Sequence, residues 1–411
     1  MRRVAVTGIG VLSPIGNSAV EIFKNACAGK SGIGLLEAPF SHRLISPLAA
    51  TVKFDAQAHF EPPKLRMLDR VSQFALIAAK HALIDSNVDL ATIDRNRAGV
   101  FMGTGMGGSI SNDDGYLSLY HDKSDRIKPF TILMGMHNAA SAWISIEYGF
   151  LGPNITYSTA CSSSSVAIGE AWLRVANSSL EIALTGGSEA PLSLGSLKAW
   201  EALNTLATID QNEPSASCKP FAKNRSGMVL GEGAVMFVLE PLEVAIKRSA
   251  NIYGEVIGYG NTTDATHITR PSVEGQANAM RAALKSASIL ASNIDAINAH
   301  GTGTLLNDAI ETAAIKSVFG HQAYDVPISA TKAIHGHLLG AAGALECALS
   351  LLAMQKNIAL PTPHLQARDE VCDLDYVPNH VRQLIKVGTM LSNSFAFGGT
   401  NVSLVLRKFM H

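Results

Sequence analysis

The sequence predicts an α/β protein in which apolar strands alternate with helices from one end of the chain to the other. Its 411 residues are 47% hydrophobic and 16% charged, and they include 35 glycines but only 6% aromatic residues. This composition is typical of a globular chain with many tight turns between strands and helices. A chain of this length can bury a large core and form two or three structural units.

The expected strands are short apolar or β-branched runs, and several of them are followed by a segment with helical spacing. We expect strands at residues 3–7, 98–103, 154–159, 181–185, 234–239, 252–259, 295–299, 326–330, 387–392 and 402–407. We expect helices at residues 19–28, 69–85, 162–176, 240–248, 274–289, 308–318 and 338–355. In residues 69–85, for example, apolar side chains recur three and four positions apart. The alternation favours layers of helices packed against sheets.

The two halves of the chain resemble each other weakly. Each ends in a long β stretch, at residues 226–239 and 387–407, that carries glycines and alternating apolar positions. Because no low-complexity tract or charged linker separates them, we expect two similar α/β halves packed as one body, residues 1–248 and 249–411. Two polar or irregular stretches are expected to form capping insertions: residues 104–130 and 196–225.

Charge and cysteine content exclude several function classes. A net charge of −1 argues against a general nucleic-acid binder. The five cysteines are widely spaced and form no CxxC pair. This favours a reducing compartment and argues against both disulfides and a structural zinc site. Residues 1–12 superficially resemble a signal peptide, but glycines interrupt the apolar run and a first strand and turn fit better. No segment is apolar for long enough to span a membrane, so we expect a cytoplasmic protein.

Cys161 follows a short apolar run and precedes a helical segment. Residues 155–172 are expected to form a buried strand, a tight turn and a helix, which places the thiol near the helix N-terminus. Unpaired N–H groups and the helix dipole there stabilise a thiolate and can lower its pKa below the free value of about 8.5. Such a thiol suits covalent catalysis through a thioester. A buried structural cysteine is the alternative, and it is the commoner fate of a lone cysteine in an apolar segment.

Residues 103–108 satisfy the GxGxxG pattern after an expected strand. A dinucleotide site would need a helix to open at once and an acidic residue after the next strand. Residues 109–115 are instead expected to form a loop, and no such strand follows. We therefore favour close backbone approach, as in the lining of a pocket. A nucleotide-dependent oxidoreductase would rest on this motif alone.

Two histidines stand near the ends of other expected strands. His300 lies beside glycines and two threonines, Thr302 and Thr304, whose hydroxyls can bond amide groups of a ligand. An ordinary loop histidine is the alternative there. His337 stands at the mouth of a helix of small residues, five positions after Lys332. The His-x-His spacing that ends at His337 can suggest a metal, but no suitably spaced Cys, Asp or Glu completes a site, so we expect none.

Residues 392–401 follow a strand and contain two aromatics, Phe395 and Phe397, before a double glycine. A β-turn is one interpretation. A mobile loop whose backbone N–H groups face the active site is the other. With the segments around the cysteine and the two histidines, this loop completes a set of four separated motifs, each at a turn after a strand.

These four motifs, in this order, resemble those of the β-ketoacyl-[acyl carrier protein] synthases of the elongating type. The similarity runs from residues 4–10 to residues 398–401 and so covers nearly the whole chain. These condensing enzymes have the thiolase fold, and the resemblance implies αβαβα layers built from two duplicated halves. It also implies a homodimer or heterodimer that takes substrates from the phosphopantetheine of an acyl carrier protein and needs no other cofactor.

The resemblance further implies a role for each matching residue. Cys161 would accept the acyl chain, and His300 and His337 would stabilise the enolate formed when malonyl-carrier protein loses its carboxylate. The enolate carbon would then attack the Cys161 thioester in a decarboxylative Claisen condensation. The other residues implied to serve the site are Lys332 with the histidines, Asp308 and Glu311 in support, Phe397 and Phe395 for gating and the oxyanion hole, Thr302 and Thr304 for the phosphopantetheine arm, Met106 and Trp200 for substrate, and Lys64 and Arg66 for carrier docking or simply a solvated helix start.

Several departures from the family pattern suggest a specialised relative. Ala396 stands where glycine is usual, Leu305 where proline is frequent, and His335 where threonine or serine is commoner. Four serines also follow Cys161 directly. These features leave open a polyketide or aryl-polyene ketosynthase, including the catalytic subunit of a heterodimer with a chain-length partner. A non-catalytic chain-length subunit is disfavoured because the cysteine and both histidines are intact.

Overall fold

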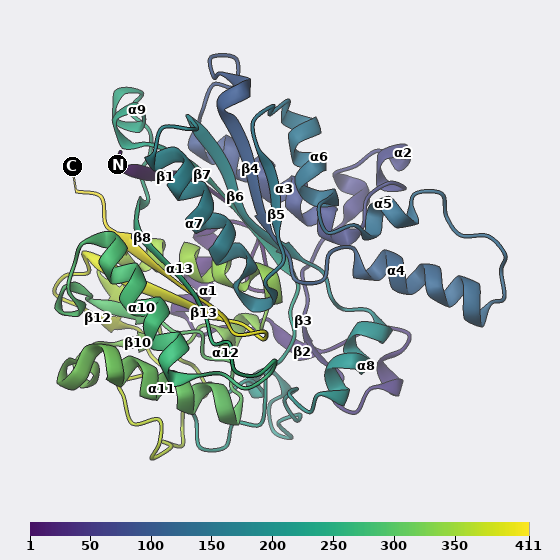
Figure 1. Ribbon diagram of the computed structural model, residues 1–411. Helices are drawn as coiled ribbons and strands as arrows, with labels where there is room; N and C mark the ends of the chain where they lie inside the picture. The colour runs from purple at the N-terminus through teal and green to yellow at the C-terminus, as the bar shows by residue number, and fades with distance from the viewer. Residues whose placement is uncertain (411) are drawn as a thin grey trace.

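Ten strands of the computed structural model form one continuous mixed sheet, and the structure describes residues 1–410 (Figure 1). The ten are β1 (Val4–Leu12), β4 (Ala98–Gly103), β5 (Asn154–Tyr157), β6 (Ile182–Glu189), β7 (Gly233–Pro241), β8 (Gly254–Thr263), β9 (Ala296–Asn298), β10 (Ile328–Ser329), β13 (Thr389–Phe395) and β14 (Thr400–Arg407). Their order across the sheet is β10-β9-β13-β14-β8-β1-β7-β6-β4-β5. Every predicted strand is present, although most boundaries shift by a few residues.

The sheet consists of two half-sheets with the same topology. In the first, β1, β7 and β6 are antiparallel neighbours, and β6, β4 and β5 run parallel. In the second, β8, β14 and β13 are antiparallel neighbours, and β13, β9 and β10 run parallel. The half-sheets meet only where residues 4–6 of β1 pair with residues 254–256 of β8. This repetition confirms the predicted duplication of two α/β halves.

Helices lie outside and between the half-sheets. The outer face of the first half-sheet carries α3 (Arg70–Ser86), and that of the second carries α10 (Val273–Ala287), with α11 (Leu305–Phe319) packed beside it. Between the half-sheets, near the centre of Figure 1, α7 (Ser163–Ala176) packs against α13 (Ala342–Lys356). The result is a stack of αβαβα layers, as predicted.

The largest apolar cluster fills the space between the half-sheets. It includes Phe101 from β4, Trp172 from α7 and Leu345 from α13, none of which is more than 5% exposed. Burial of each such side chain stabilises a fold by roughly 1.5–3 kcal/mol. This central layer therefore fixes where the turns that follow the strands meet. No helix within residues 1–410 combines the length and the apolar character needed to cross a membrane.

The first strand is longer than predicted. We expected a turn after residue 7 because of the glycines, but β1 continues through Leu12. Helix α3 crosses the strand so closely that a Cβ at Gly10 would lie 1.9 Å from the carbonyl oxygen of Ala78. A Cβ at Gly8 would lie 2.1 Å from that of Ala82. These glycines permit close packing between strand and helix, and they do not mark a turn.

Helices also occur where we predicted irregular chain. Residues 104–130 contain α4 (Ser109–Tyr116) and a π-helical turn at Leu117–His121, which together form the protruding arm in Figure 1. The sequence of α4 is mostly polar, so no apolar side chains recur at helical spacing and the helix could not be predicted from the pattern. The β stretch expected at residues 226–239 is longer than the strand that forms there, since β7 begins only at Gly233.

The remaining helices and strands are α1 (Ala19–Cys27), α2 (Pro62–Leu65), α5 (Thr131–Gly135), α6 (Ala139–Tyr148), α8 (Leu194–Ala202), α9 (Leu242–Lys247), α12 (Lys332–His335), β2 (Ile33–Leu35), β3 (Leu48–Ala50), β11 (Ile358–Ala359) and β12 (Arg382–Gln383).

Candidate active site

Cys161 lies in the turn between β5 and α7, where the sequence predicted it. Ala160 adopts a positive φ of 50°, which turns the chain from the strand into the helix. The strand itself is only half-buried, because β5 is the last strand of the sheet. The thiol is nevertheless buried, and it lines a cavity of about 350 Å³ together with His300, His337 and Phe397. Residues distant in the sequence thus meet at one cavity.

The two histidines stand beside the thiol. The sulfur of Cys161 and one ring nitrogen from each of His300 and His337 all lie within 4.8 Å of one another. The histidine rings are nearly perpendicular, with an interplanar angle of 80° and centroids 5.4 Å apart. Phe395 packs edge-on against His300 with ring centroids 6.0 Å apart and limits the movement of that ring.

Backbone contacts set the tautomer of His337. Its own N–H donates to the carbonyl oxygen of Val229 at 2.7 Å, which fixes the residue against the neighbouring chain. The Nδ1 atom accepts the N–H of Leu339 at 3.1 Å. The neutral ring must therefore carry its proton on Nε2. This Nε2 is buried and has no partner among the described residues, so a single N–H donor is available at the cavity.

Lys332 sets the tautomer of His300 in the same way. Its buried ammonium donates to the carbonyl oxygen of His300 at 2.6 Å and lies 3.3 Å from Nδ1 of that ring. Burial and the Lys332 charge hold the pKa of both His300 and His337 well below 6.5. Both rings are therefore neutral and offer Nε2–H donors. A metal ion at the cavity would have to bind the lone pairs of the two Nε2 atoms. The ring protons would then have to sit on the Nδ1 atoms, where the Lys332 ammonium and the Leu339 N–H already point.

A buried carboxylate that sequence reasoning missed balances Lys332. Glu346 of α13 forms an ion pair with the ammonium, and both side chains are almost completely buried. Burial raises the pKa of Glu346 to about 7, against the opposing effect of Lys332. The available signal was the only acidic residue in the mostly apolar helix of residues 342–356.

The pKa of Cys161 was predicted in the wrong direction. We expected the helix N-terminus to lower it, but burial raises the pKa of the thiol to about 12. The Lys332 charge and the N–H of Phe397, which bonds the sulfur, offset only part of this effect. Desolvation of the thiolate outweighs the helix dipole here because the sulfur lies in an apolar cluster. The resting site holds a neutral thiol.

Two carboxylates hold the loop that carries His300. Glu311 accepts the N–H groups of His300 and Gly301, both at 2.8 Å. Asp308 accepts the N–H groups of Thr302 at 3.1 Å and Gly303 at 3.2 Å. Burial raises the pKa of Glu311 to about 7 and also raises that of Asp308. Neither carboxylate lines the cavity, so their geometric effect is on the position of the loop.

Thr302 and Thr304 both line the cavity above the cysteine. Their hydroxyl oxygens lie 2.9 Å apart, and Thr304 caps the N-terminus of α11 through the N–H of Asn307. The pair thus presents two hydroxyl groups to any chain that enters along this wall.

Glu189 explains the glycine-rich turn of residues 103–108. Its buried carboxylate accepts the N–H groups of Gly105 at 2.6 Å, Met106 at 3.0 Å and Gly340 at 2.8 Å. Burial raises the pKa of Glu189 to about 7. Because a protein carboxylate already occupies these donors, they are not free for a phosphate. A helix does open at Ser109, contrary to our expectation, but the loop serves the Cys161 site.

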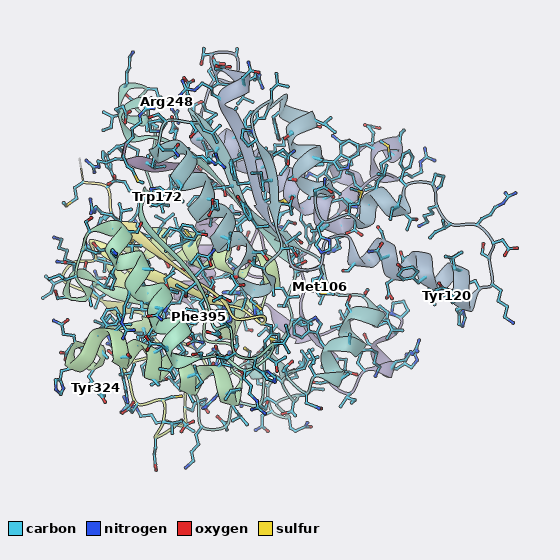
Figure 2. The ribbon with its side chains drawn as sticks, viewed as in Figure 1. Met106, Tyr120, Trp172, Arg248, Tyr324 and Phe395 are labelled. Atoms are coloured by element: carbon cyan, nitrogen blue, oxygen red, sulfur yellow. The ribbon has the colours of Figure 1, made fainter. Side chains whose placement is uncertain are left out.

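Phe397 belongs to the loop between β13 and β14. Gly398 and Gly399 follow it with positive φ angles of 84° and 79°, which a residue with a side chain adopts only under strain. The ring of Phe397 stacks on Trp200 from α8 at a centroid distance of 6.0 Å. Trp200 and Met106 pack around the apolar cluster that contains Cys161. Figure 2 shows Met106 and Phe395 toward the middle of the molecule, on different halves of the chain.

The four serines after Cys161 all have partners. The first two bond backbone groups within the turn itself, at residues 159 and 160. The third, Ser164, accepts the N–H of Ala344 from α13 at 3.0 Å. The fourth, Ser165, places its hydroxyl 2.8 Å from that of Ser394. Ser164 and Ser165 therefore fasten the start of α7 to the second half of the chain.

Lys64 and Arg66 lie apart from the Cys161 cavity. Lys64 is half-buried, pairs with Glu147 at 2.5 Å and lies 6.0 Å from the ring centroid of Trp143. Arg66 is exposed and lines a separate cavity of about 930 Å³ beside the arm, together with Arg126 and Lys128. These two cations could not be linked to Arg66 from the sequence, because they lie some 60 residues further along the chain.

Sequence comparisons match the whole chain to known proteins. Residues 1–245 match the family described as beta-ketoacyl synthase, N-terminal domain, and residues 253–366 match the beta-ketoacyl synthase, C-terminal domain. The 3-oxoacyl-[acyl-carrier-protein] synthase 2 of Coxiella burnetii (strain RSA 493 / Nine Mile phase I) is 41% identical over 413 residues, covering 99% of each chain. The protein of that name from Staphylococcus aureus (strain COL) is 38% identical over 411 residues, again 99% of each.

Solved structures of ketosynthases superpose on this chain. The ishigamide ketosynthase/chain length factor gives a TM-score of 0.93 at 32% identity, and a beta-ketoacyl synthase from Burkholderia phymatum STM815 gives 0.92 at 33%. A type II PKS ketosynthase bound to the hexaketide, in complex with its acyl-carrier protein, gives 0.92 at 32%. Each comparison covers 100% of both chains. The predicted thiolase-like fold is confirmed.

Proposed function

Because the chain belongs to the β-ketoacyl synthase family, we propose that it elongates an acyl chain by two carbons through decarboxylative Claisen condensation. The acyl group is held as a thioester on Cys161, and malonyl-[acyl carrier protein] supplies the new carbons. The observation that carries this proposal is the pair of fixed Nε2–H donors on His300 and His337 beside the buried thiol.

The first step moves the acyl group from its carrier to Cys161. The sulfur attacks the carrier thioester, the carrier thiol leaves, and the proton of the Cys161 thiol ends on that leaving sulfur. The backbone N–H groups of Cys161 and Phe397 stabilise the developing oxyanion. The N–H of Phe397 already bonds the cysteine sulfur, which supports this assignment.

The second step forms the carbon–carbon bond. The malonyl carboxylate leaves as carbon dioxide, or as bicarbonate when a water adds to it, and the enolate oxygen accepts the two Nε2–H bonds. The enolate carbon then attacks the thioester carbonyl, and the Cys161 thiolate leaves and takes up a proton from water. Lys332 keeps both rings neutral, while Asp308 and Glu311 hold the loop. Neither of these two reaction steps requires a metal, a nucleotide or another cofactor.

Apolar residues around Cys161 are the proposed site for the acyl chain. Met106 and Trp200 pack in the cluster that contains the thiol, so they would contact the chain as it grows. Phe397 stacks on Trp200, and we assign it as the gate between this region and the cavity that lies beside Thr302 and Thr304. Phe395 would keep His300 in place during opening.

Partners and location follow from the same proposal. We propose an acidic acyl carrier protein as partner, docked on Lys64 and Arg66 and on Arg126 and Lys128, which line one cavity with Arg66. A homodimer, or a heterodimer with a chain-length subunit, is proposed from the assemblies that related ketosynthases form. We also propose a cytoplasmic location, without nucleic-acid or membrane partners, and a division of the chain at residues 248 and 249. The five cysteines are all free, which supports a reducing compartment.

A second candidate differs in pathway and not in chemistry. The chain could serve as the catalytic subunit of a type II polyketide or aryl-polyene synthase. Identity to the two 3-oxoacyl-[acyl-carrier-protein] synthases is 41% and 38%, against 32% for the type II PKS ketosynthase, which supports the first pathway. The substitutions Ala396, Leu305 and His335 favour the second.

The test is reconstitution with acyl- and malonyl-carrier proteins. We expect the β-ketoacyl product from the purified chain alone, and none from Cys161→Ala. Cys27→Ala, which removes a half-buried thiol in α1, is the matched control and should keep full activity. Product only after addition of a ketosynthase-like partner would favour the heterodimer, and product from Cys161→Ala would refute the mechanism.

A further inference from the structure

The cavity above Cys161 has one charged residue in its lining. Among the described residues that line it, Arg270 alone carries a formal charge, and the others are apolar, hydroxyl, amide or imidazole groups. Arg270 is exposed, and its guanidinium forms no ion pair or hydrogen bond within residues 1–410. An unpaired cation on the wall of a cavity that contains the reactive thiol suggests an anionic ligand group.

The residues around Arg270 hold its backbone in place. Nδ1 of His267 accepts the N–H groups of Thr269 at 3.1 Å and Arg270 at 3.3 Å. The carbonyl oxygen of Ile268 accepts the N–H of Gly398 at 2.8 Å. Because Nδ1 of His267 is an acceptor, its proton lies on Nε2, and this residue also lines the cavity. A second donor therefore stands three positions before Arg270, in the same turn.

The nearest acidic residues in the sequence are already occupied. Asp264 accepts the side-chain N–H of Asn401 at 2.7 Å and the backbone N–H of Ser272 at 3.2 Å. Glu274 pairs with Arg281 at 3.0 Å. The positive charge of Arg270 is thus left without an internal counterion.

We propose that Arg270, together with the Nε2–H of His267, binds the phosphodiester of the phosphopantetheine arm. This inference rests on the proposed function, in which the arm enters the cavity with its thioester at Cys161. The threonine hydroxyls suit its amide groups, and only the far end of the arm carries a negative charge. The planar guanidinium fork matches two phosphate oxygens. The subsite would orient the arm before the thioester reaches the sulfur.

The test is protection of Cys161 from alkylation by iodoacetamide, which needs no turnover. Free phosphopantetheine and free pantetheine differ only in the phosphate. In the wild type we expect phosphopantetheine to protect at roughly tenfold lower concentration than pantetheine, as one charge-assisted contact provides. Arg270→Ala should remove this difference and leave protection by pantetheine unchanged. Arg43→Ala, at an exposed arginine that does not line the cavity, should behave like the wild type.

Three results with the free compounds would overturn the proposal. They are equal protection by both compounds in the wild type, absence of protection by either, and an equal loss for both in Arg270→Ala. A loss seen in Arg270→Ala only with carrier-bound substrate would also overturn it, because Arg270 would then recognise the carrier surface. Failure of the proposed function would appear separately, as absence of β-ketoacyl product while the difference in protection remains.

Discussion

The Nδ1 atom of His337 accepts the backbone N–H of Leu339 across 3.1 Å, and this bond decides what the ring can do. It leaves the only proton of the neutral ring on Nε2, at the cavity. With Nδ1 occupied by a donor and Nε2 protonated, His337 cannot take a proton from the thiol without breaking the bond. The geometry therefore fits a donor that stabilises an enolate better than a general base.

This relationship predicts how substitutions of His337 behave. His337→Ala removes one of two donors and should lower the condensation rate about 10²–10³-fold. His337→Asn can place an amide N–H near the same point and should recover part of that loss. Acylation of Cys161 by an acyl donor, measured by mass spectrometry, should remain in both variants. A condensation rate in His337→Ala within tenfold of the wild type would contradict the role of this donor.

The raised pKa of Cys161 predicts the pH dependence of its alkylation. With a pKa of about 12, the thiolate fraction rises about tenfold for each pH unit between 7 and 9. The rate of modification by iodoacetamide, followed at the Cys161 peptide by mass spectrometry, should rise by that factor without a plateau. A rise of only about threefold or less between pH 8 and 9 would show a thiol of ordinary or lowered pKa instead.

The serine contacts predict a close-packing effect at Gly343 of α13. A Cβ there would lie 2.1 Å from the hydroxyl oxygen of Ser165, so Gly343→Ala should lower the free energy of unfolding by about 1–3 kcal/mol. Ser165→Ala combined with Gly343→Ala should recover part of this loss. Gly34→Ala, where no atom lies within 4 Å of the added Cβ, is the control. Chemical unfolding measures all three, and equal stabilities of Gly343→Ala and Gly34→Ala would disprove the contact.

Trp200 should influence which acyl chains are accepted. Its ring stacks on Phe397 and packs beside the apolar cluster around Cys161, so Trp200→Ala enlarges the space available to the chain. We expect the variant to shift toward longer acyl groups in a competition between carrier-bound donors of different length. An unchanged chain-length preference in Trp200→Ala would remove this residue from the proposed acyl pocket.

The sequence predicted the residues that meet at the cavity because each stands at a turn after an apolar strand. That pattern alone marked Cys161, His300 and the loop with Phe397 as candidates, each with a structural alternative, since in layered α/β proteins such turns gather on one side of a sheet. The resemblance then joined them into one site. The duplicated topology was visible only weakly, and it became an expectation through the resemblance. Strand lengths were less predictable, because glycines that permit close packing with α3 resemble glycines that form turns.

What the sequence did not predict depends on partners distant along the chain. Glu189 and Glu346 stand in apolar segments, and only the folded chain reveals that one holds the turn at Gly105 and the other pairs with Lys332. The pKa of Cys161 was misjudged for the same reason. A helix N-terminus is local and can be recognised in sequence, whereas the surrounding apolar cluster is assembled from several distant segments.

The most direct test is mass spectrometry of the intact protein after incubation with acyl-carrier proteins of several chain types. The proposed chemistry predicts a mass increase equal to one acyl group, located on the Cys161 peptide, and its absence from Cys161→Ala. Addition of malonyl-carrier protein should then remove the acyl group and give a carrier-bound β-ketoacyl product. Acylation that persists in Cys161→Ala, or an acyl-enzyme that malonyl-carrier protein does not discharge, would contradict it.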